Sequence, residues 1–373
     1  MRISARGTLN CGEPGTRRAI STFPTVTSLS DGILLATFRV GSTKDSDDET
    51  IEFRRSVDGG RTWTDPVTPF SSLLEGRRGS LKVAYLTPLD GQHLIAAALW
   101  IDREAFPGRP LFNEKTEGCL PMAVVLADSY DFGHTWTPWR VLPVPAETGP
   151  PSLTSPVLRT KTGRLLVSIE SNKNYEDSSQ WFQHVVYVGS EDGGRTWGAP
   201  MTVSQDPTAR IFNWDQRAGV CPDGRLVTFT WTYDRQTTKY LNVHRSLSHD
   251  EGRTWTSPED LGFADQPSRP AILPDGRIVV AWVDRFQSRS IRARMARSCE
   301  AAFSGETEVT RYDLGRSQSS AAGGGDTGEI LAEMAVWNFG LPYAESLPDG
   351  DVIVVYYEGD AASMRCSWVR LTL

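Results

Sequence analysis

The sequence has few of the residues that bind metals or cross-link a chain: 373 residues include five cysteines and five histidines. The cysteines are scattered, without metal-ligand spacing; they are Cys11, Cys119, Cys221, Cys299 and Cys366. An odd number of dispersed cysteines is atypical of a disulfide framework, so we expect reduced, buried thiols in a cytosolic protein. We predict neither a metal site nor a cofactor.

Long apolar runs are also missing. No stretch approaches the roughly 18 apolar residues of a membrane-spanning helix, and residues 1–6 open no apolar signal segment. We therefore expect no membrane partner and a cytoplasmic location, or a secreted protein if a leader has been removed. The formal net charge of −7 gives no reason to expect nucleic acid as a partner.

Helical periodicity is nearly absent, whereas 12 tryptophans, 33 glycines and 23 prolines fit many short strands joined by tight turns. Six pairs of apolar segments are each connected by a short turn of the kind typical of tight β-connections. These turns are Asp31-Gly32, Asp90-Gly91, Thr162-Gly163, Asp223-Gly224, Asp275-Gly276 and Asp349-Gly350. The pattern predicts six β-hairpins.

One octapeptide pattern, S-x-D-x-G-x-T-W, occurs four times, at residues 56–63, 129–136, 190–197 and 248–255. Such a repeat is typical of one supersecondary unit stacked on copies of itself. Asp and Gly favour a turn, and the Trp ring packs against the flank of its own unit. We expect these turns to stabilise the fold and not to contact substrate.

Hairpins and repeats together predict an all-β chain that forms a six-bladed β-propeller of four-stranded antiparallel blades. Residues 1–373 then form one domain, whose blades are approximately residues 20–75, 76–148, 149–208, 209–263, 264–335 and 336–373 with 1–10. The sixth blade runs out after its third strand. We therefore expect Arg2 to Leu9 to supply the missing strand and to cover the open edge.

The octapeptide resembles the Asp box of the sialidase and BNR-repeat superfamily, and this resemblance covers nearly the whole chain. It implies a sialidase-like propeller and a carbohydrate ligand. Since one fold hosts many chemistries, the activity has to be argued from the site.

Polar residues gather where the first strand of each blade begins and where its second and third strands connect. Loops at this rim converge on the centre of a propeller. Because arginine forks bind carboxylates, an anionic glycan is the expected partner, with aromatic rings stacked on sugar faces. The candidate binding residues are Arg39, Arg217, Arg235, Arg269, Arg285, Glu358, Trp181 and Trp214.

The family typically carries an arginine triad for the substrate carboxylate, an Asp acid and a Tyr nucleophile assisted by Glu. Arg39 matches the family's arginine that closes the second strand, and Asp45 matches the acid. Glu358 matches the Glu that orients the first arginine of the triad. Thr22 occupies the position where that first arginine is expected. Leu341 occupies the position where the Tyr nucleophile is expected, and Tyr343 follows two residues later. These departures argue against a standard sialidase and favour a relative acting on another glycan.

A glycoside hydrolase is the favoured function, with Asp45 as acid/base and its pKa raised by burial beside apolar walls. Its candidate partners are Glu170, Asp215 and Tyr343. A polysaccharide lyase on uronate chains is the second possibility, and it would use Tyr175, His184 or Tyr343 to move the α-proton. The third is a glycan-binding propeller without turnover.

Overall fold

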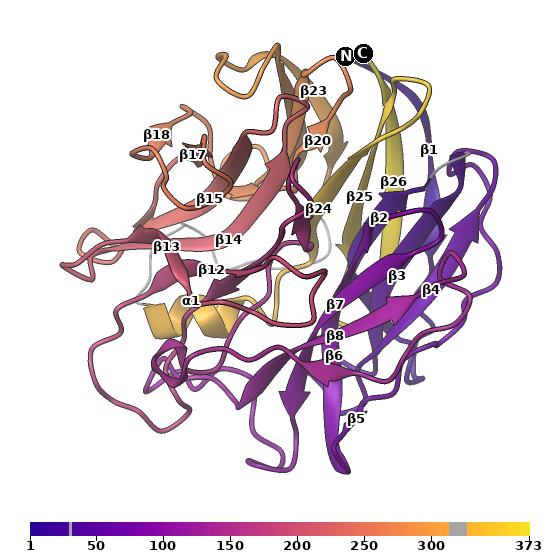
Figure 1. Cartoon of the computed structure of the whole chain (residues 1–373). Helices are drawn as coiled ribbons and strands as arrows, with labels where there is room; N and C mark the ends of the chain where they lie inside the picture. The colour runs from indigo at the N-terminus through magenta and orange to yellow at the C-terminus, as the bar shows by residue number, and fades with distance from the viewer. Residues whose placement is uncertain (30–31, 313–326) are drawn as a thin grey trace.

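The computed structural model describes residues 1–29, 32–312 and 327–373 and shows a nearly all-β chain, as predicted (Figure 1). The described residues include one α-helix, α1 (Thr327–Glu333), and one 3₁₀ turn at Ala146–Thr148. Asp31 of the first predicted hairpin turn lies outside the described residues.

The strands form six antiparallel meanders in chain order. The first has β2 (Ile20–Ser28), β3 (Leu34–Gly41) and β4 (Thr50–Ser56). The second has β5 (Leu73–Leu74), β6 (Arg77–Pro88), β7 (Leu94–Asp102), β8 (Met122–Ser129) and β9 (Arg140–Val141). The third has β10 (Leu158–Arg159), β11 (Leu165–Glu170), β12 (His184–Ser190) and β13 (Met201–Gln205).

The fourth meander has β14 (Ile211–Val220), β15 (Leu226–Asp234), β16 (Lys239–Tyr240), β17 (His244–Ser248) and β18 (Glu259–Asp260). The fifth has β19 (Gln266–Pro267), β20 (Ala271–Ile272), β21 (Ile278–Asp284), β22 (Ser290–Ala296) and β23 (Ser304–Arg311). The sixth has β24 (Phe339–Ser346), β25 (Val352–Gly359), β26 (Met364–Thr372) and β1 (Arg2–Asn10). Successive meanders pack against each other, and the sixth packs against the first.

The N-terminal strand completes the sixth meander, which confirms the predicted pairing. β1 runs antiparallel to β26, with Arg2 opposite Thr372 and Asn10 opposite Cys366. The two chain ends consequently lie side by side (Figure 1). This pairing covers an edge of β26 that would otherwise expose unpaired backbone groups.

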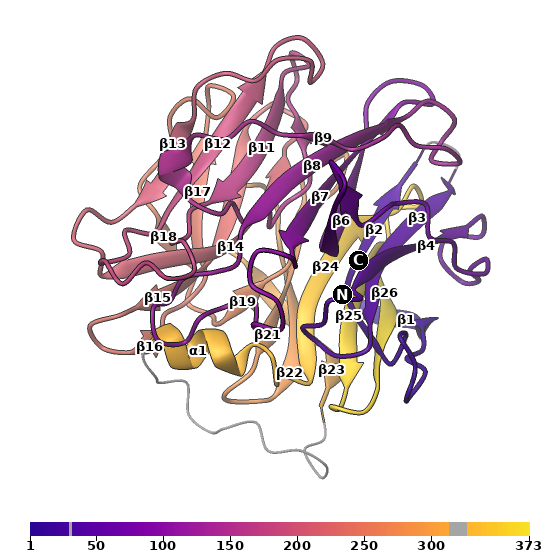
Figure 2. The same cartoon turned by 90° about the horizontal axis from the view of Figure 1, so that it is seen from below.

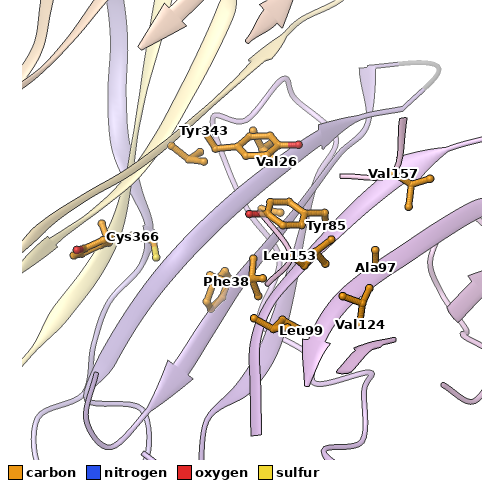
Figure 3. Packing of buried hydrophobic residues seen from close by; sticks show 14 of the residues in the cluster. Val26, Phe38, Tyr85, Ala97, Leu99, Val124, Leu153, Val157, Tyr343 and Cys366 are labelled. Carbon is orange, nitrogen blue, oxygen red and sulfur yellow. The ribbon is translucent and has the colours of Figure 1, made fainter. Parts of the chain in front are cut away.

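Each central strand is buried on both of its faces. In β7, Ile95, Ala97 and Leu99 join one core cluster, whereas the alternating residues Leu94, Ala96, Ala98 and Trp100 join another. Successive strand side chains point to opposite faces, so β7 contacts a different neighbouring meander on each side. Figure 3 shows part of the first cluster, in which Leu99 and Val124 of the second meander join Leu153 and Val157, which precede β10 of the third.

The four octapeptides form one and the same hydrogen-bonded turn. In the first copy, Asp58 accepts hydrogen bonds from the Ser56 and Thr62 hydroxyls at 2.8 and 2.6 Å, and the N–H of Gly60 donates to Ser56 Oγ at 2.9 Å. Gly60 has a φ of 87°, a conformation that favours glycine. Asp131, Asp192 and Asp250 repeat these contacts.

All five cysteines are free thiols. Four of them are buried, as expected, but Cys11 is exposed, so the prediction of five buried thiols is wrong at that position. Cys11 follows β1 and precedes the loop that returns to β2, where the chain lies at the surface.

Candidate active site

Bulges in the innermost strands direct side chains toward the centre of the molecule. In four meanders, the pairing of the innermost strand with the next strand shifts register at a bulge. The shifts lie between Thr22 and Thr25 (β2), Leu81 and Val83 (β6), Trp214 and Arg217 (β14), and Gly340 and Tyr343 (β24). In three of these bulges the first extra residue has a positive φ: Phe23 at 51°, Asp215 at 49° and Leu341 at 45°. Positive φ is strained for such residues, and strain of this kind clusters at functional sites.

The bulged residues line a single cavity of about 690 Å³, in the size range of small-ligand pockets. All six meanders contribute to its wall, together with residues 109–115 and α1. Ile330 and Leu331 of α1 are buried against Trp181, Trp214 and Trp337. Figure 2 shows α1 beside β15 and β16. The cavity therefore has an aromatic, apolar side beneath the helix.

A pair of carboxyl groups, Glu170 and Asp215, faces this cavity. Glu170 ends β11 and is buried, and its Oε1 accepts hydrogen bonds from the Thr154 hydroxyl and the Gln216 N–H, both at 2.8 Å. Burial, together with the charge of Asp215, raises the pKa of Glu170 to about 7. Glu170 can therefore hold a proton near neutral pH beside a second carboxylate.

Asp215 is held by two side chains. Its Oδ1 accepts from Arg217 Nη2 at 3.2 Å, and its Oδ2 accepts from the Gln266 amide. Arg217 Nη1 also donates to the Tyr85 hydroxyl, at 2.8 Å, and to the Thr154 carbonyl. Arg217 thus fixes Asp215 from the floor of the cavity.

The surroundings of Asp45 differ from those that the sequence analysis expected. Its carboxylate accepts from Arg103 Nη2 at 2.8 Å and from the Leu111 N–H at 2.7 Å, and it lies 3.5 Å from Lys82 Nζ. Burial acts to raise the pKa of Asp45, but Lys82 and Arg103 together lower it well below its ordinary value. The predicted rise in pKa is therefore wrong, because cations and not apolar walls surround this group.

Of the five predicted arginines, Arg217 alone is among the described residues that line the cavity. Arg39 is buried and pairs with Glu49 at 2.6 Å. Arg235 pairs with Glu117 at 2.7 Å, and Arg269 pairs with Glu345. Arg285 donates to the Phe339 carbonyl at 2.7 Å and lies 3.9 Å from the ring centroid of Trp337. The expected convergence of Arg39, Arg217 and Arg269 on one pocket is wrong, because carboxylates of the protein itself engage Arg39 and Arg269.

Of four other predicted residues, two line the cavity and two lie outside its lining. Trp181 and Trp214 line the cavity. His184 begins β12, away from the cavity lining, and its Nδ1 lies 3.1 Å from the Phe182 carbonyl. Glu358 pairs with Arg365 at 2.9 Å and also lies outside the lining.

Tyr343 lies in the core below the cavity. Its ring stacks on Tyr85 at a centroid distance of 6.1 Å, and Figure 3 shows the two rings close together. Residues two apart in a regular strand point to the same side, but the positive φ of Leu341 breaks this alternation before Tyr343. Leu341 therefore lines the cavity while Tyr343 packs beneath it.

Several lining residues were not predicted as site residues, among them Phe23, Trp231 and Gln266. One available signal was proline inside two inner strands, at Pro24 and Pro342, because strand proline is confined to edges and bulges. Each of these prolines follows a bulged residue that lines the cavity. Within residues 1–29, 32–312 and 327–373, no His, Cys, Asp or Glu cluster could hold a metal ion, and no helix could span a membrane.

No protein-family model matches the chain. An exo-alpha-sialidase from Arthroderma benhamiae is 29% identical over 154 residues, which cover 34% of this chain and 34% of that protein. The chain thus matches about a third of that relative's length.

Solved structures resemble the chain over nearly its full length. A protein of unknown function from Dyadobacter fermentans has a TM-score of 0.74 at 20% identity, with 100% of both chains covered. A Hadza microbial sialidase has a TM-score of 0.65 at 15% identity and covers 96% of this chain and 66% of its own. The intramolecular trans-sialidase from Ruminococcus gnavus has a TM-score of 0.63 at 13% identity, with 96% of each chain covered. The chain therefore has the sialidase-like fold that its sequence predicted.

Proposed function

We propose that the chain is a glycoside hydrolase of the sialidase-like superfamily that cleaves an acidic glycan in the central cavity. The six meanders are the blades of a closed six-bladed propeller in this proposal. The observation that carries it is the pair Glu170 and Asp215, two carboxyl groups in one cavity with the pKa of Glu170 raised to about 7. Glycosidases commonly use two carboxyl groups, one of which is protonated.

The two carboxyl groups have separate roles. Glu170 gives its proton to the glycosidic oxygen as the bond from that oxygen to the anomeric carbon breaks. Asp215, held by Arg217 and Gln266, stabilises the positive charge that develops on the sugar. Water then adds hydroxyl to the anomeric carbon, and its proton goes to a carboxylate of the pair. Trp181 and Trp214, which are buried among other aromatic side chains, add apolar wall beside the sugar.

Relatives named sialidase support a glycan as the substrate class. Two features set this chain apart from the arrangement expected of a sialidase. Thr22 occupies the first arginine position, and Leu341 the position of the Tyr nucleophile. The proposal therefore assigns the chemistry to Glu170 and Asp215.

The test is release of new reducing ends from a panel of sialylated and uronate-containing oligosaccharides. Glu170→Gln keeps an acceptor for Thr154 and Gln216 but has no acidic proton to transfer to the leaving oxygen. We expect it to lower kcat by about 10²–10⁴-fold with little change in Kd. Glu358→Gln, outside the cavity, is the matched control and should act like the parent. Parental turnover by Glu170→Gln would contradict the assignment.

The same assay distinguishes the alternatives. A lyase would produce an absorbing unsaturated uronate in place of a hydrolysed end, and a binding protein would produce neither. Two of the proton carriers expected of a lyase, His184 and Tyr343, lie outside the cavity lining. Burial raises the pKa of the third, Tyr175, so less of it is ionised and able to take a proton near neutral pH.

A further inference from the structure

One lysine of the cavity wall has no carboxylate partner. Lys44 follows β3, and its Nζ donates to the Trp337 carbonyl at 2.6 Å and to the Tyr357 hydroxyl at 3.0 Å. Both acceptors are neutral, and no carboxylate within the described ranges forms an ion pair with Lys44. An ammonium group has three donors, so one is left for a ligand in the cavity.

Positive charge exceeds negative charge around Lys44. The cations of this cluster are Arg39, Lys44, Lys82 and Arg103, and its largely buried carboxylates, Asp45 and Glu49, pair with Arg39, Lys82 and Arg103 but not with Lys44. The cluster thus has four cations and two such carboxylates, while Asp47, 3.8 Å from Arg103, is exposed. Arg39 Nε and Nη2 are also buried without a partner. A buried excess of one charge is costly, so a bound anion would be stabilised here.

The surroundings of Lys44 link its charge to ligand binding. Burial, followed by the charges of Arg285, Arg39 and Lys82, lowers the pKa of Lys44 well below its ordinary value. The other groups that face it are the neutral Tyr357 hydroxyl and the Trp337 carbonyl. A ligand carboxylate beside Nζ would favour the ammonium form, so binding takes up a proton at any pH between the pKa of the free and the bound protein.

We propose that Lys44 binds the carboxylate of the substrate, a role that the sequence analysis gave to arginines. This inference rests on the proposed function, because it places an acidic sugar in the cavity shared with Glu170. Arg217 holds Tyr85, Thr154 and Asp215 with its two Nη groups, whereas Lys44 has a donor to spare. A sulfate ester has the same acceptor chemistry, so the experiment separates the two anions.

The experiment measures binding of D-glucuronate, D-glucose and glucose 6-sulfate to the full chain by calorimetry. Parent protein should prefer glucuronate to glucose, and Lys44→Met should lower that preference by about tenfold or more. Lys44→Arg keeps a cation and should retain the preference. Lys161→Met is the matched control, because Lys161 is exposed beside the Thr162-Gly163 turn and lies outside the cavity lining. It should bind like the parent.

Proton uptake gives a second readout. The binding enthalpy of glucuronate should vary with the ionisation enthalpy of the buffer, and this variation should be smaller for Lys44→Met than for the parent, because Glu170 also titrates in the cavity. An unchanged preference in Lys44→Met, or equal binding of glucuronate and glucose by the parent, would overturn the assignment. Tighter binding of glucose 6-sulfate than of glucuronate would also contradict the proposal, because the preferred anion would then be a sulfate ester and not a carboxylate. If Glu170→Gln turns over normally while Lys44→Met loses the preference for glucuronate, the hydrolase proposal fails, but the role of Lys44 in binding a carboxylate stands.

Discussion

At the scale of residues, two carboxyl groups in one cavity hold their protons very differently. Asp45 is surrounded by Arg103, Lys82 and the Leu111 N–H, whereas Glu170 is buried beside another acid, Asp215. Burial, together with the charge of Asp215, raises the pKa of Glu170, whereas at Asp45 the nearby cations outweigh burial and lower the pKa. A general acid has to hold its proton at the working pH, which Glu170 can do and Asp45 cannot.

The pH dependence of turnover follows from this difference. With Glu170 as the acid, the active form is protonated, so kcat/KM should fall tenfold per pH unit as pH rises past about 7. A pH–rate profile on a cleaved oligosaccharide measures this limb. Because the pKa of Asp45 is lowered, Asp45 stays ionised across this range and should add no limb there. A flat profile between pH 6 and about 9 would contradict Glu170 as the acid.

The same pKa affects stability. The pKa of Glu170 is raised in the folded chain from its ordinary 4.5 to about 7, so the folded state binds more protons between these values. Its contribution to the free energy of unfolding is therefore lost as pH rises from about 4.5 to 7. Glu170→Gln should be more stable than the parent at pH 8, by roughly 1–3 kcal/mol. Denaturant unfolding at pH 5 and 8 checks this, and an equal difference at both pH values would count against it.

At the scale of elements, the octapeptide turns hold strand ends together without contacting the cavity. Asp58→Ala removes the acceptor of four hydrogen bonds, from Ser56, Arg61 and Thr62. Because the turn is partly exposed, we expect a loss of about 1 kcal/mol in the free energy of unfolding. Kd for glucuronate should stay parental. Weaker binding at full stability would show that the turn acts on the site.

The regular elements were predictable because their signals are local. Turn residues and the repeated octapeptide indicated the hairpins, and the missing strand of the last meander indicated β1. The site was less predictable, because the inner-strand bulges place Phe23, Asp215 and Leu341 in the cavity against the strand alternation. Ion pairs formed inside the protein, such as Arg39 with Glu49, depend on neighbours that a single sequence does not reveal.

At the scale of the whole molecule, β1 joins the two ends of the chain in one sheet. Deleting residues 2–9 should expose the edge of β26 and the Trp368 ring that lies against Gly7. We expect lower solubility and a Tm lower by several degrees, because an unpaired edge strand invites association. Thermal melting and light scattering measure both effects. Parental melting of the truncated protein would show that the pairing contributes nothing.

The pairing of β1 with β26 also determines how the molecule responds to force. Arg2 lies opposite Thr372, so a pull on the two chain ends acts at one end of an antiparallel ladder. The hydrogen bonds of that ladder are then loaded one after another, as in a zipper, and not all at once in shear. A tether attached through the termini should peel β1 away at low force and leave the other meanders in place.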